Sequence, residues 1–193
     1  MTIPGISAEY NPFHRGHAYH LSRARELTGA DYLVVVMSGN YVQRGVPAMF
    51  DKYTRAEAAL LGGADLVLEL PLPAACGSAE YFADGAVDLL IQPGIVTDLC
   101  FGSECGDLEV LSEAASLLAD EPEEYRSPLR RHLRKGVSFP LARAMALQEA
   151  LPSASPDILS SPNNLLGIEY LKALKRRKSG IRPHTIAREG NGY

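Results

Sequence analysis

Short apolar runs alternate with amphipathic stretches along the first hundred residues. Residues 32–37 (YLVVVM) are continuously apolar, as in a strand buried on both faces of a parallel sheet. The pattern predicts strands at 3–9, 32–37, 65–70 and 96–101 and helices at 14–27, 51–61 and 79–91. In the first helix, Leu21 and Leu27 are predicted to face inward. Pro71 and Pro73 are predicted to end the third strand.

The second half of the chain is predicted to be mainly helical. Helices are expected at 107–119, 123–134, 139–150 and 163–178, a Pro/Ser-rich connection at 151–162 and a last strand at 184–188. Strands that alternate with helices indicate βαβ units, so the fold class is α/β, a Rossmann-like doubly wound parallel sheet with additional helices in the second half. Ligands of such folds bind at the carboxyl ends of the strands.

Composition excludes several classes of protein. No apolar run approaches the roughly 20 residues that span a bilayer, so no membrane partner is expected. No cationic segment precedes an apolar stretch at the N-terminus, which argues against a signal peptide. The three cysteines cannot all pair and show no C-x-x-C spacing, which indicates a reduced, cytoplasmic protein.

Charge is distributed unevenly. The net charge is −4, but residues 1–125 hold 6 Lys/Arg against 19 Asp/Glu, a net of −13, and residues 126–193 hold 13 against 4, a net of +9. The cations concentrate at 126–135 and 172–182. This split predicts an anionic partner such as RNA for the basic part, with an ordinary solvated face as the alternative.

The segment between the first strand and the first helix carries the clearest chemistry. His14-Arg15-Gly16-His17 matches the H-x-G-H signature of the nucleotidyltransferase superfamily. N–H groups at a helix start attract phosphate, Gly16 allows close approach, and two imidazoles can stabilise charge on the α-phosphate and the departing pyrophosphate. The alternative is a helix cap with surface histidines. A metal site of His14, His17 and His20 is not expected, because at about 100° per residue His20 is offset from His14 by about 120° around the helix, so the three side chains do not share one face.

Further motifs extend this match over nearly the whole chain. They are 9–14 with Gly16-His17, 37–45, Pro47-Ala48, 52–55, 65–71, 101–104, 135–136, 161–164 and 188–193. In this order they resemble the bacterial tRNA(Met) cytidine acetate ligase family. Because members of that family are longer, the resemblance implies that the chain is an N-terminal catalytic portion. It also implies one nucleotidyltransferase-like domain over 1–193, with a βα core at 1–105, a helical insertion at 106–160 and a return to the ATP site at 161–193.

The resemblance implies an ATP-dependent ligase. Such an enzyme forms acetyl-adenylate and then acetylates N4 of the wobble cytidine of elongator tRNA(Met). Its substrates would be acetate, the tRNA and ATP accompanied by Mg²⁺, without metal-ligating protein residues. The implied catalytic residues are His14 and His17. The implied ATP-binding residues are Ser7, Ala8, Glu9, Tyr10, Asn11, Pro12, Phe13, His14, Arg15, Gly16, His17, Ala18, Tyr19, His20, Gly102, Asn163, Asn164 and Arg188.

Several of these positions have structural alternatives. Gly102, after the fourth strand, admits adenine or ribose, or is a plain turn. Asn163 and Asn164, at a helix start, serve ATP or an N-cap, and the sequence does not say which of them contacts ATP. Arg188 reaches a phosphate or makes a surface ion pair.

The loop after the second strand is a second candidate. Gln43, Arg44, Lys52 and Arg55 can serve acetate, phosphate or tRNA, although Lys52 and Arg55 also fit a solvated helix face. No carboxylate is needed as a base, because acetate is already ionised near neutral pH. Two other functions remain open: a small-molecule adenylyltransferase that makes a dinucleotide-type cofactor, and a non-catalytic tRNA-binding module.

Overall fold

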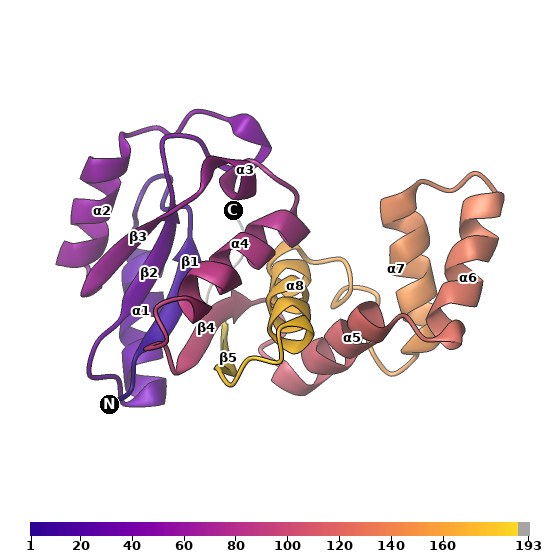
Figure 1. Ribbon diagram of the computed structural model, residues 1–193. Coiled ribbons are helices and arrows are strands. Elements are labelled where there is room, and N and C mark those ends of the chain that lie inside the picture. Colours follow the sequence, from indigo (N-terminus) through magenta and orange to yellow (C-terminus); the bar gives the residue numbers. More distant parts are fainter. Residues whose placement is uncertain (189–193) are drawn as a thin grey trace.

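A parallel sheet of five strands organises the molecule, which is a computed structural model that describes residues 1–188 (Figure 1). The strands are β1 (Pro4–Ala8), β2 (Val34–Ser38), β3 (Leu66–Leu70), β4 (Asp98–Ser103) and β5 (Arg182–Ala187). Their spatial order is β3-β2-β1-β4-β5, and every pairing is parallel. The predicted doubly wound α/β class is confirmed. The strand order reverses between β1 and β4, the point where open α/β sheets bind ligands.

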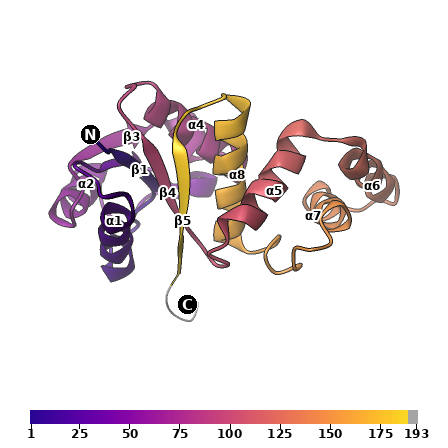
Figure 2. The same ribbon diagram turned by 90° about the horizontal axis from the view of Figure 1, so that it is seen from below.

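Helices cover both faces of the sheet. They are α1 (Arg15–Thr28), α2 (Lys52–Leu61), α3 (Leu72–Ala75), α4 (Ala79–Ile91), α5 (Leu108–Asp120), α6 (Glu123–Arg134), α7 (Phe139–Ala150) and α8 (Pro162–Arg176), with a 3-10 turn η1 (Gln43–Gly45). Figure 2 shows α1 and α2 on one face and α4 and α8 on the other. Beyond α8, helices α5, α6 and α7 extend away from the sheet, and α6 and α7 form a hairpin.

Strand alternation sends side chains into two separate cores. Ile6 and Val35 pack with Leu21 beneath α1 and α2. Val34 and Phe101 face α4 and α8 in a larger core that continues into α5 and α7. Burial of each such side chain contributes about 1.5–3 kcal/mol. Because these interiors fill both faces, only the edges of the sheet are left for ligand binding.

Close packing of α8 on β4 depends on one glycine. A Cβ at Gly167 would lie 2.5 Å from Cε2 of Phe101, which is closer than real atoms approach. Glycine therefore lets α8 approach the sheet, and the Phe101 and Tyr170 rings pack with their centroids 5.8 Å apart. This approach sets the start of α8 beside the end of β4.

Some local predictions are wrong in detail. Leu21 is buried, but Leu27 is 50% exposed, because six positions place it about 120° around the helix from Leu21. The second strand begins at Val34, and Tyr32 before it is exposed. The last strand begins at Arg182 and contains Pro183, which an edge strand tolerates.

The sequence pattern did not predict two short elements. The turn η1 and the short helix α3, which follows Pro71, have too few residues for a periodic pattern. Within residues 1–188, no helix combines the length and apolarity needed to cross a membrane.

Candidate functional site

The two signature histidines are fixed by main-chain hydrogen bonds at the start of α1. His14 is the N-cap residue, and its Nδ1 accepts from the N–H of Gly16 at 3.1 Å. Nδ1 of His17 accepts from the N–H of His14 at 3.2 Å. A neutral imidazole whose Nδ1 accepts carries its proton on Nε2. Both rings are therefore held in the tautomer that has Nε2–H as a donor.

The same two rings are stacked, with centroids 3.7 Å apart and planes 25° from parallel. Burial, followed by repulsion from Arg188 and from the protonated forms of His14 and His20, lowers the pKa of His17 to about 4. His17 is therefore neutral near pH 7 and acts as a hydrogen-bond donor rather than as a cation. The arrangement can stabilise negative charge that develops on a phosphate.

Gly102 and Arg188 lie next to this pair. Gly102 is inside β4, paired with Ile186, so neither its predicted place after the strand nor the plain-turn alternative is correct. The N–H of Arg188 donates to the carbonyl of Ser103 at 3.0 Å, which extends the β5 pairing by one residue. A Cβ at Gly102 would lie 3.8 Å from Cγ of Arg188, so the arginine stem passes over the glycine. The charge of Arg188 also acts on His17.

The start of α8 is capped from β4 rather than by its own asparagines. The N-cap residue is Ser161, so the N-cap alternative for Asn163 and Asn164 is wrong. The carboxylate of Glu104 accepts from the N–H of Asn163 at 3.2 Å, from the N–H of Asn164 at 2.9 Å and from Nδ2 of Asn163 at 2.6 Å. Burial opposes the charge, but these hydrogen bonds outweigh it and hold the pKa of Glu104 below its ordinary value.

The two asparagines are thereby distinguished. Asn164 is buried, its Oδ1 accepts from the N–H groups of Glu104 and Cys105, and its Nδ2 donates to the carbonyl of Ile158. Three hydrogen bonds of its amide thus join β4 to α8 and the segment before it. Asn163 is half-buried and has one side-chain hydrogen bond, to Glu104. Asn163 is thus the asparagine that a ligand can reach.

Two other signature residues hold a loop rather than face the histidines. Oε1 of Glu9 accepts from the N–H of Gln43 at 2.8 Å, and Oδ1 of Asn11 accepts from the N–H of Met49 at 2.7 Å. Both contacts tie the loop between β2 and α2 to the signature segment. The sequence did not indicate this role.

Arg55 ties the same loop from beneath. The residue is 1% exposed, and its guanidinium donates to the main-chain carbonyls of Glu9, Ser38, Gly39 and Phe50. The solvated-face alternative is therefore wrong for Arg55. The solvated-face alternative fits Lys52 better, although Nζ of Lys52 pairs with Glu69 at 2.5 Å.

The other residues of the signature segment belong to β1, to the turn after it or to α1. Ser7 and Ala8 end β1, and Pro12 follows a cis peptide bond. Tyr10 is buried, has a φ of 48°, and packs its ring 5.0 Å from Phe13 and 4.7 Å from His17. Arg15, Gly16, Ala18, Tyr19 and His20 belong to the first half of α1.

His20 lies deeper along α1 than the other two histidines. Burial lowers the pKa of His20 to about 4. The buried Nε2 of its ring has no hydrogen-bond partner among the described atoms. Within residues 1–188, no group of three or more His, Cys, Asp or Glu side chains is arranged to hold a metal ion.

Most cations of the basic stretch at 172–182 are neutralised within the fold. Five of its six cations form the pairs Lys172–Glu80, Lys172–Glu169, Lys175–Asp120, Arg176–Glu80, Arg177–Asp84, Arg177–Asp88 and Arg182–Asp98, whereas Lys178 has no ion pair in the described structure. Most of these carboxylates belong to the acidic first part of the chain, so the two charge excesses largely compensate one another. In the stretch at 126–135, Arg134 and Lys135, near the tip of the α6–α7 hairpin, likewise have no ion pair in the described structure.

A parallel sheet with paired histidines at its switch point defines the class of a nucleotidyltransferase-fold protein. The family model for HIGH nucleotidyl transferases matches residues 1–193, and the chain belongs to that family. It is 53% identical to the tRNA(Met) cytidine acetate ligase of Acetivibrio thermocellus over 100% of this chain and 47% of that protein. It is also 49% identical to the tRNA(Met) cytidine acetate ligase of Clostridium novyi, over 100% of this chain and 49% of that protein.

Solved structures give the same relationship. TmcAL of Thermotoga maritima bound with alpha-thio ATP superposes with a TM-score of 0.94 at 47% identity, covering 98% of this chain and 47% of that one. The apo form of that protein also matches with a TM-score of 0.94. The chain therefore spans about half the length of the relatives it matches.

Proposed function

We propose that this chain carries the adenylate-forming site of an ATP-dependent acetate ligase that acetylates N4 of the wobble cytidine of elongator tRNA(Met). The observation that carries the proposal is the stacked pair of His14 and His17, fixed through Nδ1 at the start of α1. The names of relatives at about half identity, and the ATP analogue in the Thermotoga maritima structure, support it.

In the first step, a carboxylate oxygen of acetate attacks the α-phosphorus of ATP. A new P–O bond forms, the bond to the bridging oxygen breaks, and pyrophosphate leaves with the electron pair. The Nε2–H groups of His14 and His17 donate to phosphate oxygens on which charge develops, and Arg188 adds a positive charge beside them. Acetate is ionised at neutral pH, so this step needs no general base.

In the second step, N4 of the cytidine attacks the acetyl carbonyl carbon and displaces AMP. The amide forms with loss of one proton from the nitrogen. This step requires RNA to reach the carboxyl edge of the sheet, where the histidines lie.

The remaining contacts to ATP are proposed residue by residue. Gly102 presents its bare backbone beside Arg188 to the nucleotide, and Asn163 faces the ligand because three hydrogen bonds already engage the amide of Asn164. The segment 7–20 forms the floor of the ATP site, with Glu9 and Asn11 acting through the loop they hold. Mg²⁺ would arrive with the triphosphate and neutralise part of its charge. A cytoplasmic location and a single catalytic unit over 1–193 belong to the same proposal.

The test is exchange of labelled pyrophosphate into ATP by the full-length protein, with and without acetate. Acetate-dependent exchange is expected, and His17→Gln should lower its rate by about 10²- to 10³-fold. His184→Gln is the matched control, because His184 pairs with Asp98 in β4 and lies away from the signature. Absence of exchange with acetate, combined with turnover of a nicotinamide, pantetheine or flavin phosphate, would instead identify a small-molecule adenylyltransferase.

A further inference from the structure

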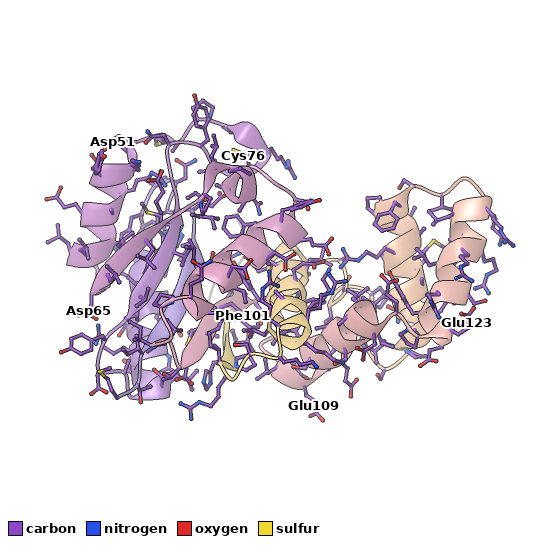
Figure 3. All side chains as sticks on the ribbon, in the orientation of Figure 1. Asp51, Asp65, Cys76, Phe101, Glu109 and Glu123 are labelled. Carbon is purple, nitrogen blue, oxygen red and sulfur yellow. The ribbon has the colours of Figure 1, made fainter. Side chains whose placement is uncertain are left out.

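Large apolar side chains are exposed on the loop between β2 and α2 together with the start of α2, residues 39–53, which we call the edge loop. The exposed fractions are 46% for Tyr41, 51% for Val46, 68% for Met49, 50% for Phe50 and 76% for Tyr53. The loop stands at the carboxyl edge of the sheet, on the side where Figure 3 labels Asp51 and Cys76. Exposed apolar groups gathered in this way mark an interaction surface more often than a solvated one.

The edge loop is held in place rather than left loose. Tyr41 and Pro47 form an antiparallel bridge, and the N–H of Ala48 donates to the carbonyl of Asn40 at 2.9 Å. Glu9, Asn11 and Arg55 anchor it from below through the contacts described above. The apolar side chains therefore point outward from a fixed backbone, which reduces the ordering entropy that binding would cost.

One cation of this surface is left without a protein partner. Arg44 is exposed, has a left-handed φ of 64°, and makes no ion pair or side-chain hydrogen bond in the described structure. Lys52 and Arg55, by contrast, are engaged with Glu69 and with main-chain carbonyls. Because a left-handed backbone is unfavourable for arginine, this fixed conformation is a candidate functional feature.

Exposed aromatic rings beside an unpaired cation are the chemistry that binds single-stranded RNA. Every base offers a face for stacking, and the cation meets the phosphate backbone. The ring of Tyr53 already has Nζ of Lys52 5.4 Å from its centroid. Tyr41 and Phe50 are therefore the better stacking platforms.

We propose that the edge loop receives the unpaired bases of the RNA loop that carries the target cytidine, with Tyr41 and Phe50 as stacking platforms and Arg44 as a phosphate contact. This inference rests on the proposed function. The reactive amine must reach the acyl-adenylate at this edge, so neighbouring bases have to leave their stack here. Stacking on the protein offsets the cost of that unstacking.

The experiment measures binding of an elongator tRNA(Met) transcript to the full-length protein. The double variant Tyr41→Ala/Phe50→Ala is expected to weaken binding by at least about tenfold, since each lost stack is substantial. Arg44→Gln should reduce the slope of log Kd against log salt concentration by about 0.7, the value for one single-strand phosphate contact. Tyr32→Ala is the control, because Tyr32 is 54% exposed at the opposite edge, before β2.

Acetate-dependent pyrophosphate exchange is measured on the same variants and should stay within about twofold of wild type, because the acetyl-adenylate step needs no RNA. Equal Kd values for wild type and the double variant would overturn the proposal, and so would an equal loss of exchange and binding. Loss of self-association without loss of RNA binding would assign the surface to a second copy of the chain. Absent exchange in the wild type would contradict the proposed function, whereas the binding comparison tests the edge loop separately.

Discussion

The guanidinium of Arg55 in α2 donates a 2.5 Å hydrogen bond to the main-chain carbonyl of Glu9, which follows β1. The same group donates to the carbonyl of Ser38 at 3.0 Å at the end of β2. One buried side chain thus joins the carboxyl ends of two neighbouring strands. The edge of the sheet where the histidines lie is consequently a rigid platform.

Replacement of Arg55 is therefore expected to destabilise the fold. Arg55→Met leaves several buried carbonyls without donors and should lower the free energy of unfolding by about 3 kcal/mol or more. Arg55→Lys should rescue little, because an ammonium cannot reproduce the planar fork. Urea unfolding at pH 7 measures both variants.

The matched control is Arg126→Met. Arg126 is exposed and lies 3.6 Å from Glu123, so its loss should change the free energy of unfolding by less than about 1 kcal/mol. Equal stabilities for Arg55→Met and wild type would show that the arginine does not hold the two strands.

The depressed pKa values of His17 and His20 predict a pH dependence of stability. Both groups have folded pKa values of about 4 against an ordinary value of 6.5, so the unfolded chain binds protons first. Stability is complete above pH 6.5 and falls as the pH decreases toward 4. The slope is at most about 1.4 kcal/mol per pH unit for each histidine.

His20→Gln isolates one of these contributions. Denaturant titrations between pH 7 and pH 4 should give a shallower loss of stability for this variant than for wild type. The comparison is a difference between two proteins with the same carboxylates, so acid titration of Asp and Glu cancels. Identical slopes would mean that His20 titrates normally in the folded protein.

The hydrogen bonds of Glu104, Asn163 and Asn164 between the end of β4 and the start of α8 predict different effects for these three residues. Asn164→Ala should cost about 2 kcal/mol or more, because buried main-chain groups of Glu104, Cys105 and Ile158 lose their partner. Glu104→Gln should cost roughly 1 kcal/mol at pH 7, the scale of a solvent-exposed helix cap. Since the folded pKa of Glu104 is depressed, this second difference should vanish as the pH falls below that pKa.

Asn163→Ala tests the other asparagine. It should leave the free energy of unfolding within about 0.5 kcal/mol of wild type, yet raise the Kd for ATP, because Asn163 is the asparagine proposed to contact ATP. Isothermal titration with ATP gives the affinity. An unchanged ATP affinity combined with a large loss of stability would reverse the assigned roles.

Much of the architecture could be predicted from the chain. Strand positions followed from runs such as residues 32–37, and the boundaries of α4, α6 and α7 agree with the predicted ranges 79–91, 123–134 and 139–150. The position of the histidines after β1 also followed, because the pattern fixes which element comes first. The prediction that Leu27 faces inward is wrong because the helix that carries it has a narrow apolar face.

The supporting contacts could not be predicted. Arg55 and Glu9 are separated by 46 positions, and Glu104 and Asn163 by 59, so no local pattern connects them. The charge split was likewise ambiguous. Lys and Arg in the stretch 172–182 suggested an external anion, whereas the fold directs most of them to carboxylates such as Asp88 and Asp98.

The most direct test of the proposed function is mass analysis of elongator tRNA(Met) after incubation with the full-length protein, ATP and acetate. Digestion to nucleosides should show the wobble cytidine heavier by one acetyl group, only when all three components are present. His17→Gln should leave the cytidine largely unmodified. An unmodified wobble cytidine with the folded, wild-type, full-length protein would contradict the proposal.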